Sequence, residues 1–225
     1  MALEFPGGTA GVTSRGESLG IGSELSEHGT ALVLVAGYAG SGKSEAGKMM
    51  SQATGWPLLD KDTLTRPLTE SLLTHLNGDP DDRQSSVYTG SVRPLEYESL
   101  MKACWENLEC GVPVVAVAPF LAEVVDEQWA SRTRRHCARL GAGLEVVWVD
   151  SDASSMRERL TSRNAARDTW KLANWGQYLA SISLERRPVG EFHFVDNRIT
   201  AMTPLAEQVE SVAAALAGRY SEGLA

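Results

Sequence analysis

Short apolar runs alternate with longer stretches of helical periodicity over most of the chain. The apolar runs predict five strands, near residues 31–36, 57–59, 112–118, 144–149 and 192–195. Helical patterns lie between and after them, near residues 43–53, 65–76, 91–110, 122–141, 153–166, 169–186 and 203–218. The strands are rich in valine and do not alternate apolar with polar positions, which indicates that both faces of the sheet are covered. We therefore expect an α/β fold with a doubly wound, parallel five-stranded sheet and three-layer α/β/α architecture.

Residues 1–29 differ from the rest of the chain, because they are rich in Gly, Ser, Thr and Glu and show no hydrophobic periodicity. This composition is typical of a disordered tail. Residues 30–225 contain neither an internal repeat nor a change of composition, so we expect one domain there. In a doubly wound sheet, ligands bind at the carboxyl ends of the strands. The residues that follow the predicted strands are therefore the first candidates for a functional site.

The composition suits one compact domain that needs no disulfides, with 225 residues of which 43% are hydrophobic and 22% charged. A net charge of −8 disfavours a nucleic-acid partner, which needs a basic surface. The sequence shows no apolar run of membrane-spanning length and no signal-peptide pattern, so we expect a cytoplasmic protein without a membrane partner. Cys104, Cys110 and Cys137 form no C-x-x-C pair and are expected to be reduced thiols in the core.

A phosphate-binding loop follows the first predicted strand. Residues 37–44 read Gly-Tyr-Ala-Gly-Ser-Gly-Lys-Ser and satisfy the pattern G-x-x-x-x-G-K-[ST]. Glycines let backbone N–H groups approach phosphate oxygens, and the N-terminus of the next helix adds the positive end of its dipole. Lys43 supplies charge for the β- and γ-phosphates, and the Ser44 hydroxyl is placed to ligate Mg²⁺. We expect ATP and Mg²⁺ as cofactors, bound by Gly37, Gly40, Ser41, Gly42, Lys43 and Ser44.

Two carboxylates follow the second predicted strand, beside the phosphate loop in the expected topology. Asp60 and Asp62 are separated by one residue, and such a pair near a γ-phosphate could activate a hydroxyl and orient Mg²⁺. We expect Asp62 to act as the base and Asp60 to contact the metal and the acceptor. Sequence alone leaves this assignment open. It also leaves open that either aspartate caps a helix starting near Thr63, or that Asp-Lys-Asp is a solvated turn.

An arginine cluster follows the fourth predicted strand. Arg159, Arg163 and Arg167 are spaced by four residues, which places three guanidinium groups on one face of a helix. Like charges repel unless an anion lies against them, and arginines stabilise the charge of a transferring phosphoryl group. We expect the three to form a lid over the nucleotide. The alternative is a solvated helix face on which Glu158 and Asp168 are the ion-pair partners.

A polar connection over residues 78–98 is the candidate acceptor-binding segment, since long loops are often functional. Its tyrosines and arginine offer stacking and hydrogen-bonding groups for a polar small molecule, although a surface loop with a helix start at Pro94 explains it equally well. The candidate acceptor ligands are Asp60, Arg66, Tyr88, Arg93 and Tyr97. Trp170, Trp175 and Tyr178 also recur at helical spacing, which is more typical of core packing.

These motifs together resemble the small phosphate-loop kinases, a branch of the P-loop NTPases. The phosphate loop, the Asp-x-Asp after the second strand and the Arg-x-x-x-Arg after the fourth are similar in layout to chloramphenicol phosphotransferases, zeta toxins and the kinase domain of polynucleotide kinase. Gluconate and adenylylsulfate kinases share this layout. The resemblance covers roughly residues 30–218, and its specific part is the phosphate loop.

The resemblance implies roles for several of these residues. Asp62 would deprotonate the acceptor hydroxyl, and Lys43, Arg159 and Arg163 would neutralise the triphosphate. Asn197 follows the fifth predicted strand, where related kinases contact the adenine. One departure is that residues 115–120 end the third strand without the metal-orienting aspartate of many phosphate-loop enzymes. Another is the absence of an insert like that of adenylate kinase, which makes a mononucleotide acceptor less favoured.

We therefore expect an ATP- and Mg²⁺-dependent phosphotransferase that acts on a hydroxyl of a small polar molecule, either a metabolite or an antibiotic. A zeta-toxin-like nucleotide-sugar kinase and a polynucleotide 5′-hydroxyl kinase are alternatives among enzymes. A regulatory nucleotide-binding ATPase switch is the alternative from another class. The sequence identifies neither the acceptor nor the oligomeric state, and it does not distinguish ATP from GTP.

Overall fold

The computed structural model describes residues 29–220 and contains one parallel sheet. Its five strands are β1 (Thr30–Ala36), β2 (Leu58–Asp60), β3 (Val114–Val117), β4 (Ala142–Asp150) and β5 (His193–Asp196). They lie in the order β2-β3-β1-β4-β5, and every neighbouring pair is parallel. The predicted fold class is therefore confirmed. Apart from Gly29, the predicted tail lies outside the described residues.

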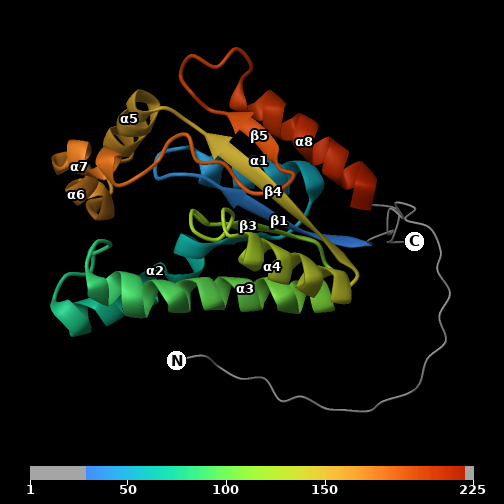
Figure 1. Cartoon of the computed structure of the whole chain (residues 1–225), viewed down its shortest axis with the longest axis horizontal. Helices are drawn as coiled ribbons and strands as arrows, with labels where there is room; N and C mark the ends of the chain where they lie inside the picture. Colours follow the sequence, from blue (N-terminus) through green and yellow to red (C-terminus); the bar gives the residue numbers. More distant parts are fainter. Residues whose placement is uncertain (1–28, 221–225) are drawn as a thin grey trace.

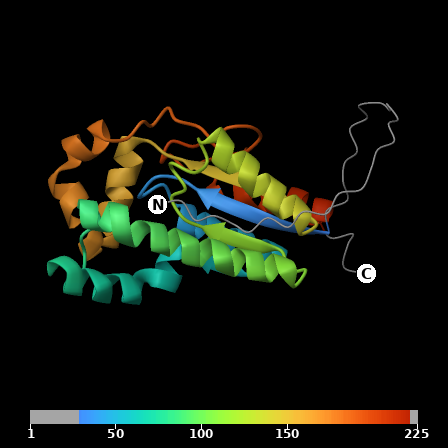
Figure 2. The ribbon, with the colours of Figure 1, turned by 60° about the horizontal axis from the view of Figure 1, so that its bottom comes forward.

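Helices cover both faces of the sheet and gather at its carboxyl end (Figure 1). The bounds are α1 (Lys43–Thr54), α2 (Lys61–Asn77), α3 (Arg93–Glu109), α4 (Glu127–Arg139), α5 (Ala153–Arg163), α6 (Thr169–Ala173), α7 (Trp175–Ala180) and α8 (Leu205–Tyr220). In Figure 2 the arrowheads of β1 and β3 point toward the end of the molecule where α5, α6 and α7 face α2 and the start of α3. Across residues 29–220, none of the helices combines the length and the apolarity needed to cross a membrane.

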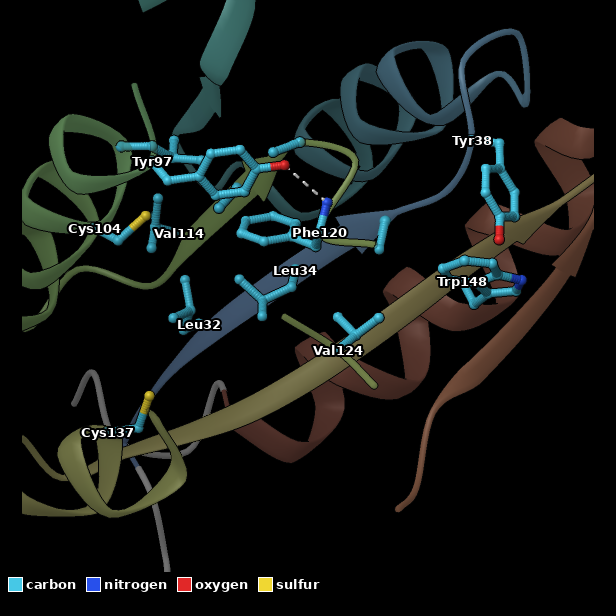
Figure 3. Packing of buried hydrophobic residues seen from close by; sticks show 14 of the residues in the cluster. Leu32, Leu34, Tyr38, Tyr97, Cys104, Val114, Phe120, Val124, Cys137 and Trp148 are labelled. Atoms are coloured by element: carbon cyan, nitrogen blue, oxygen red, sulfur yellow. Dashed lines mark hydrogen bonds between the residues drawn. The ribbon is translucent and has the colours of Figure 1, made fainter. Parts of the chain in front are cut away.

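The central strand β1 is buried along its whole length because it packs against helices on both faces. Leu32 and Leu34 belong to the core formed with α3 and α4, in which Phe120 also lies (Figure 3). Val33 and Val35 point to the opposite face and pack with α1 and α8. Burial on both faces explains why the strand sequence is apolar without alternation.

The cysteines divide between core and surface. Cys104 and Cys137 are buried in the core beneath α3 and α4, and burial raises the pKa of each thiol to about 12. Cys110 is exposed. The prediction that it belongs to the core is wrong, because it follows the last residue of α3, where the chain turns into Gly111.

Side-chain caps move the starts of α2 and α4 away from their predicted positions, and another predicted helix is divided in two. Helix α2 begins at Lys61 and not near residue 65, since the Asp60 carboxylate accepts hydrogen bonds from the N–H groups of the first turn. Helix α4 begins at Glu127, directly after its cap Asp126, and not at residue 122. The predicted helix over 169–186 is two short helices, α6 and α7, that meet at Asn174.

The end of α5 overturns the predicted arginine face. This helix stops at Arg163 because Asn164 adopts the left-handed conformation, with φ of 47°. Arg167 therefore lies in the following 3₁₀ turn, Ala166–Asp168, and not one turn further along the same helix as Arg159 and Arg163.

A glycine pair tests the packing of the helix that begins at the phosphate loop. A Cβ on Gly47 of α1 would lie 2.3 Å from Cγ2 of Val117, whereas a Cβ on Gly218 of α8 would meet nothing within 4 Å. We expect Gly47→Ala to lower the free energy of unfolding by about 1–3 kcal/mol through overpacking. Gly218→Ala should leave it unchanged or raise it by up to about 1 kcal/mol. Urea unfolding of both variants measures this, and a stable Gly47→Ala protein would contradict the packing of α1 on β3.

Candidate active site

The phosphate loop joins the end of β1 to the start of α1. Gly40 and Gly42 adopt left-handed conformations with φ of 80° and 95°. A Cβ at these positions would lie 2.6 Å from the Met156 carbonyl oxygen and 2.1 Å from Nδ2 of Asn197, so glycine is required at both. No side chain caps α1, and its first N–H groups are left for the hollow of the loop. This cradle fits a phosphate group.

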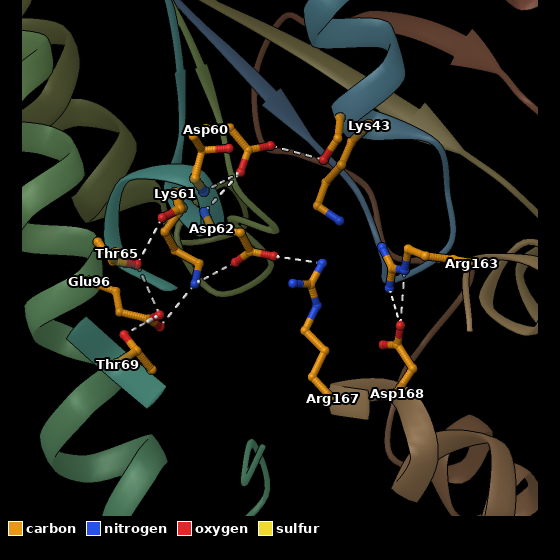
Figure 4. Close-up of polar contacts among 12 residues, drawn as sticks. Lys43, Asp60, Lys61, Asp62, Thr65, Thr69, Glu96, Arg163, Arg167 and Asp168 are labelled. Atoms are coloured by element: carbon orange, nitrogen blue, oxygen red, sulfur yellow. Dashed lines mark hydrogen bonds and ion pairs between the residues drawn. The ribbon is translucent and has the colours of Figure 1, made fainter. Parts of the chain in front are cut away.

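Lys43 and Ser44 are the first two residues of α1, and the side chain of Lys43 extends toward the residues that follow β2 (Figure 4). The ammonium group of Lys43 donates a 3.3 Å hydrogen bond to the Tyr38 carbonyl oxygen. Burial lowers the pKa of Lys43 to about 8, although the charge of Asp62 acts in the opposite direction. The Ser44 hydroxyl donates a 3.0 Å hydrogen bond to Oδ2 of Asp60.

The Ser44–Asp60 pair fits a magnesium ion that is bound together with a phosphate. A hydroxyl and a carboxylate oxygen lie side by side there, and Mg²⁺ is usually held by one or two protein oxygens with phosphates and water. In residues 29–220 no group of three His, Cys, Asp or Glu side chains could hold a metal alone. The end of β3 contributes Ala118 and Pro119 to the pocket, both without a metal-binding side chain. The protein oxygens for Mg²⁺ would therefore come from Ser44 and Asp60.

The two aspartates after β2 have different environments. Oδ1 of Asp60 caps α2 by accepting hydrogen bonds from the N–H groups of Asp62 and Thr63, so the capping alternative is correct for Asp60. The other carboxylate oxygen, Oδ2, accepts the hydrogen bond from the Ser44 hydroxyl. Asp62 lies in the first turn of α2 and forms ion pairs with Lys61, at 3.1 Å, and Arg167, at 3.2 Å. Burial raises its pKa, but the charges of Lys61 and Arg167 outweigh this and hold the pKa well below its usual range. Asp62 is therefore a carboxylate at neutral pH.

A buried ion pair lies directly behind Asp62. The Lys61 side chain, 5% exposed, contacts Oε2 of Glu96 at 2.9 Å, and the Glu96 side chain is 4% exposed. The carboxylate of Glu96 also accepts hydrogen bonds from Thr65 and Thr69, at 3.1 and 3.0 Å (Figure 4). A further hydrogen bond comes from the Tyr88 hydroxyl, at 2.8 Å. The alternative of a solvated Asp-Lys-Asp turn is therefore wrong for Lys61. The sequence signal for this cluster was the spacing of Lys61, Thr65 and Thr69 by four residues, a polar stripe on one face of α2.

Two of the three candidate lid arginines reach the pocket. Arg163 forms an ion pair with the buried carboxylate of Asp168, and Arg167 contacts Asp62. Lys171 also lines the pocket and lies 3.5 Å from Asp168. The alternative of a solvated helix face named Asp168 as an ion-pair partner, and this ion pair is present at Arg163. Both residues, however, line the pocket.

Arg159 and Asn197 brace the phosphate loop from behind. The guanidinium group of Arg159 donates to the Gly40 carbonyl at 3.2 Å, to the Ser151 hydroxyl at 3.0 Å and to the Asn197 carbonyl. The amide of Asn197 donates to the Ser41 carbonyl at 2.7 Å. Neither residue lines the pocket. In this structure both residues therefore support the loop, and the predicted contacts of Arg159 with the phosphates and of Asn197 with the adenine stay predictions.

A pocket of about 300 Å³ lies at the carboxyl ends of β1, β2 and β3. It runs from the phosphate loop to the start of α3, and among the described residues its wall carries more basic than acidic side chains. The basic residues are Lys43, Lys61, Arg83, Arg93, Arg163, Arg167 and Lys171, and the acidic ones are Asp60, Asp62 and Asp168. An excess of positive charge in a concave site attracts polyphosphates. The pocket therefore contrasts with the net charge of −8 of the whole chain.

The structure separates the candidate acceptor residues. Tyr88, Arg93 and Tyr97 line the pocket opposite the phosphate loop. Arg66 is exposed on α2 and does not line the pocket, so its role as an acceptor ligand stays a prediction without support from the pocket geometry. Tyr178 is buried against the core, as expected, and also forms part of the pocket wall.

Sequence comparison assigns the chain to a family. The family model described as AAA domain matches residues 32–184, more than half of the chain, and the chain belongs to this family. No curated protein matches the sequence.

Solved structures with the same fold are described as kinases. A sugar kinase from Janibacter sp. HTCC2649 is 16% identical, with a TM-score of 0.55 over 83% of this chain and 94% of that chain. A gluconokinase from Sinorhizobium meliloti 1021 is 21% identical, with a TM-score of 0.51 over 88% of this chain and 99% of that chain. The APS kinase of Mycobacterium tuberculosis in complex with AMPPNP and APS is 20% identical, with a TM-score of 0.50 over 83% of this chain and 97% of that chain.

These matches confirm the predicted resemblance at the level of the fold, which is that of the small phosphate-loop kinases. The narrower likeness to chloramphenicol phosphotransferases, zeta toxins and polynucleotide kinase stays a prediction.

Two glutamates on α3 test the buried cluster behind Asp62. Glu96→Ala leaves the charge of Lys61 without its deeply buried partner, and removing one member of a buried pair costs about 3–5 kcal/mol. Glu98→Ala removes only an exposed ion pair with Lys102, which solvent screens, so the stability of this variant should change little. Chemical unfolding of both variants gives the comparison. Equal stability losses would mean that the Lys61–Glu96 pair does not hold α2 and α3 together.

Proposed function

We propose that this protein is an ATP- and Mg²⁺-dependent kinase that transfers the γ-phosphoryl group to a hydroxyl of a small molecule. One observation carries the proposal: the lysine and serine of the phosphate loop share a single pocket with Asp62 and with the tyrosines and arginines at the start of α3. A nucleotide switch needs the phosphate loop but no second wall of this kind. The descriptions of the solved structures with this fold, which include a sugar kinase and a gluconokinase, support the same class.

The phosphate side of the pocket would bind the triphosphate. The backbone of the loop and Lys43 would contact the β- and γ-phosphates, while Ser44 and Asp60 would hold Mg²⁺, whose charge offsets that of the phosphates. Arg163, Arg167 and Lys171 would approach from the opposite wall. Since phosphoryl transfer depends mainly on positioning and charge stabilisation, these groups supply most of what the reaction needs.

Asp62 would bind the acceptor hydroxyl and receive its proton. As the acceptor oxygen bonds to the γ-phosphorus, the bond to the leaving oxygen of ADP breaks, and the hydroxyl proton passes to the Asp62 carboxylate and then to solvent. The ion pairs that hold its pKa down make Asp62 a weak base in the free protein. A γ-phosphate competes for Arg167, and loss of this ion pair would raise the basicity of Asp62 when the nucleotide is bound.

The function is tested by screening hydroxyl compounds, metabolites and antibiotics among them, for acceptor-dependent release of ADP. With an acceptor in hand, Asp62→Asn should lower kcat by about 10²–10⁴, the usual size of a general-base effect, while the affinity for AMPPNP changes little. Asp60→Asn is the comparison variant. Its loss should be partly restored by more Mg²⁺, since Asp60 touches Ser44 and caps α2. Near-normal phosphorylation by Asp62→Asn would rule out this residue as the base, and ADP release that no acceptor stimulates would favour an ATPase switch.

The pKa of Lys43 gives a pH test of the phosphate site. Above about pH 8 the free protein holds Lys43 mainly as the neutral amine, whereas a bound triphosphate stabilises the ammonium form. Binding of AMPPNP should therefore weaken as pH rises through about 8, and at about pH 9.5 it should take up close to one proton. Calorimetry in buffers of different ionisation enthalpy measures this uptake. Lys48→Met changes an exposed lysine of the same helix and should keep the uptake, whereas Lys43→Met should abolish it. Binding without proton uptake in the unmodified protein would contradict the placement of Lys43.

A further inference from the structure

Two arginine–tyrosine stacks form the wall of the pocket that faces the phosphate loop. The guanidinium group of Arg83 lies 5.2 Å from the ring centre of Tyr88, and that of Arg93 lies 4.2 Å from the ring centre of Tyr97. All four residues line the pocket. Stacking on an aromatic ring holds a guanidinium group in one orientation and shields one of its faces from water. The two cations are therefore fixed features of this wall.

Three of the four side chains already have their polar groups engaged. The Tyr88 hydroxyl donates to Glu96, and the Tyr97 hydroxyl accepts a 3.1 Å hydrogen bond from the N–H of Phe120. Arg93 contacts both carboxylate oxygens of Glu123, at 2.9 and 3.2 Å, so its charge is balanced. These three residues shape the pocket, and their polar groups already have partners within the protein.

Arg83 is different because its charge is not balanced. Nη1 donates to the carbonyl oxygens of Pro80 and Asp82, at 3.0 and 2.8 Å, which anchors the side chain to its own loop. Within residues 29–220, Nε and Nη2 have no hydrogen-bond partner, and no carboxylate lies within 4 Å of the group. The unused edge of the guanidinium group is thus the one that carries two parallel N–H groups.

Asp79 and Asp82 of the same loop do not balance Arg83, because their carboxylates accept hydrogen bonds from neighbouring residues. Oδ1 of Asp79 accepts from the N–H of Asp81 at 2.9 Å. Asp82 accepts from the N–H groups of Gln84 and Ser85 and from the Asn77 amide. The acidic sequence around Arg83 therefore organises the loop and leaves the cation for the pocket.

We propose that the acceptor carries an oxyanion, a carboxylate or a sulfate or phosphate ester, which binds to Nε and Nη2 of Arg83, while its hydroxyl lies at Asp62. The proposal rests on the kinase function proposed above and specifies the acceptor. Paired N–H groups of arginine match two oxygens of such a group and form charge-assisted bonds. A neutral polyol would leave the charge of Arg83 unbalanced in a half-buried wall, which disfavours it relative to an anionic acceptor.

The test measures oxyanion binding on protein whose phosphate loop is already filled. Sodium sulfate and sodium acetate are titrated separately by calorimetry into protein saturated with AMPPNP and Mg²⁺, at constant ionic strength. We expect one saturable site, and Arg83→Ala should raise its Kd by at least about tenfold. Arg83→Lys keeps the charge but loses the paired N–H groups, so its Kd should lie between those of the unmodified protein and Arg83→Ala. Tighter sulfate indicates a sulfate or phosphate ester acceptor, and tighter acetate indicates a carboxylate.

Arg135→Ala is the matched control, since Arg135 is exposed on α4, bonds to Ser131 and does not line the pocket. It should leave the Kd of both anions unchanged. Absence of saturable anion binding in the unmodified protein, or an unchanged Kd in Arg83→Ala, would overturn the proposal. An uncharged acceptor that the unmodified protein and Arg83→Ala phosphorylate with equal kcat/KM would also overturn it.

The anion site and the kinase function can fail separately. If AMPPNP does not bind, the proposed function fails while the Arg83 site is still open to test. The titration is then repeated on Lys43→Ala protein, in which the anion affinity of the phosphate loop is reduced, with and without Arg83→Ala. Binding that depends on Arg83 in this background would support the oxyanion site by itself, and binding independent of Arg83 would exclude it.

Discussion

The buried ion pair between Lys61 and Glu96 determines how the acceptor side of the pocket is built. Lys61 is the first residue of α2 and Glu96 lies in the first turn of α3, so their contact fixes the two helices against each other. Burying two charges is costly unless hydrogen bonds satisfy their remaining capacity. Here Tyr88 and the two threonines of α2 supply those bonds to Glu96. Since Lys61 also contacts Asp62, the same pair orients the candidate base.

The phosphate side depends on a second set of long-range contacts. Glycines contribute no side-chain contacts to the loop, and its shape is maintained in part by Arg159 and Asn197, which donate to the carbonyl oxygens of Gly40 and Ser41. Tyr38 adds a 2.6 Å hydrogen bond from its hydroxyl to the Ser183 carbonyl. The N–H groups of Gly37 and Ser41 bond within the protein. Because Arg159 and Asn197 hold the loop by its carbonyl groups, they leave its other N–H groups for an anion.

Charge is distributed so that the pocket differs from the protein as a whole. The chain is acidic, yet basic side chains dominate the wall of the described pocket, and most of them are paired with Asp62, Asp168, Glu96 or Glu123. Cations that are paired with carboxylates repel one another less while the pocket is empty. When a nucleotide binds, these cations can exchange a carboxylate partner for a phosphate group. On the acceptor side, Arg83 has no carboxylate partner among the described residues, and its free charge therefore indicates the charge expected of the acceptor.

The sequence by itself determined the fold class and the phosphate loop. Apolar runs of strand length predict the sheet wherever both faces are buried, and the loop motif is contiguous and depends on backbone conformation, so its residues can be identified without knowing the rest of the fold. The placement of Asp60 and Asp62 followed from the same topology. Helix ends were less predictable, because each depends on the conformation of one residue. Asp60 and Asp126 cap helix starts with their side chains, and Asn164 ends a helix through its left-handed backbone.

Only the tertiary structure decided which partner each charged side chain has. Arg159 lies 119 residues from the Gly40 carbonyl that it binds, and Glu96 lies 27 residues from Thr69, so helical spacing alone could not identify either contact. Spacing of four placed three arginines on one predicted face, but the left-handed Asn164 ended the helix and separated Arg167 from the other two. The pairing of charges across elements depends on how the elements pack, and this information is distributed over the whole chain.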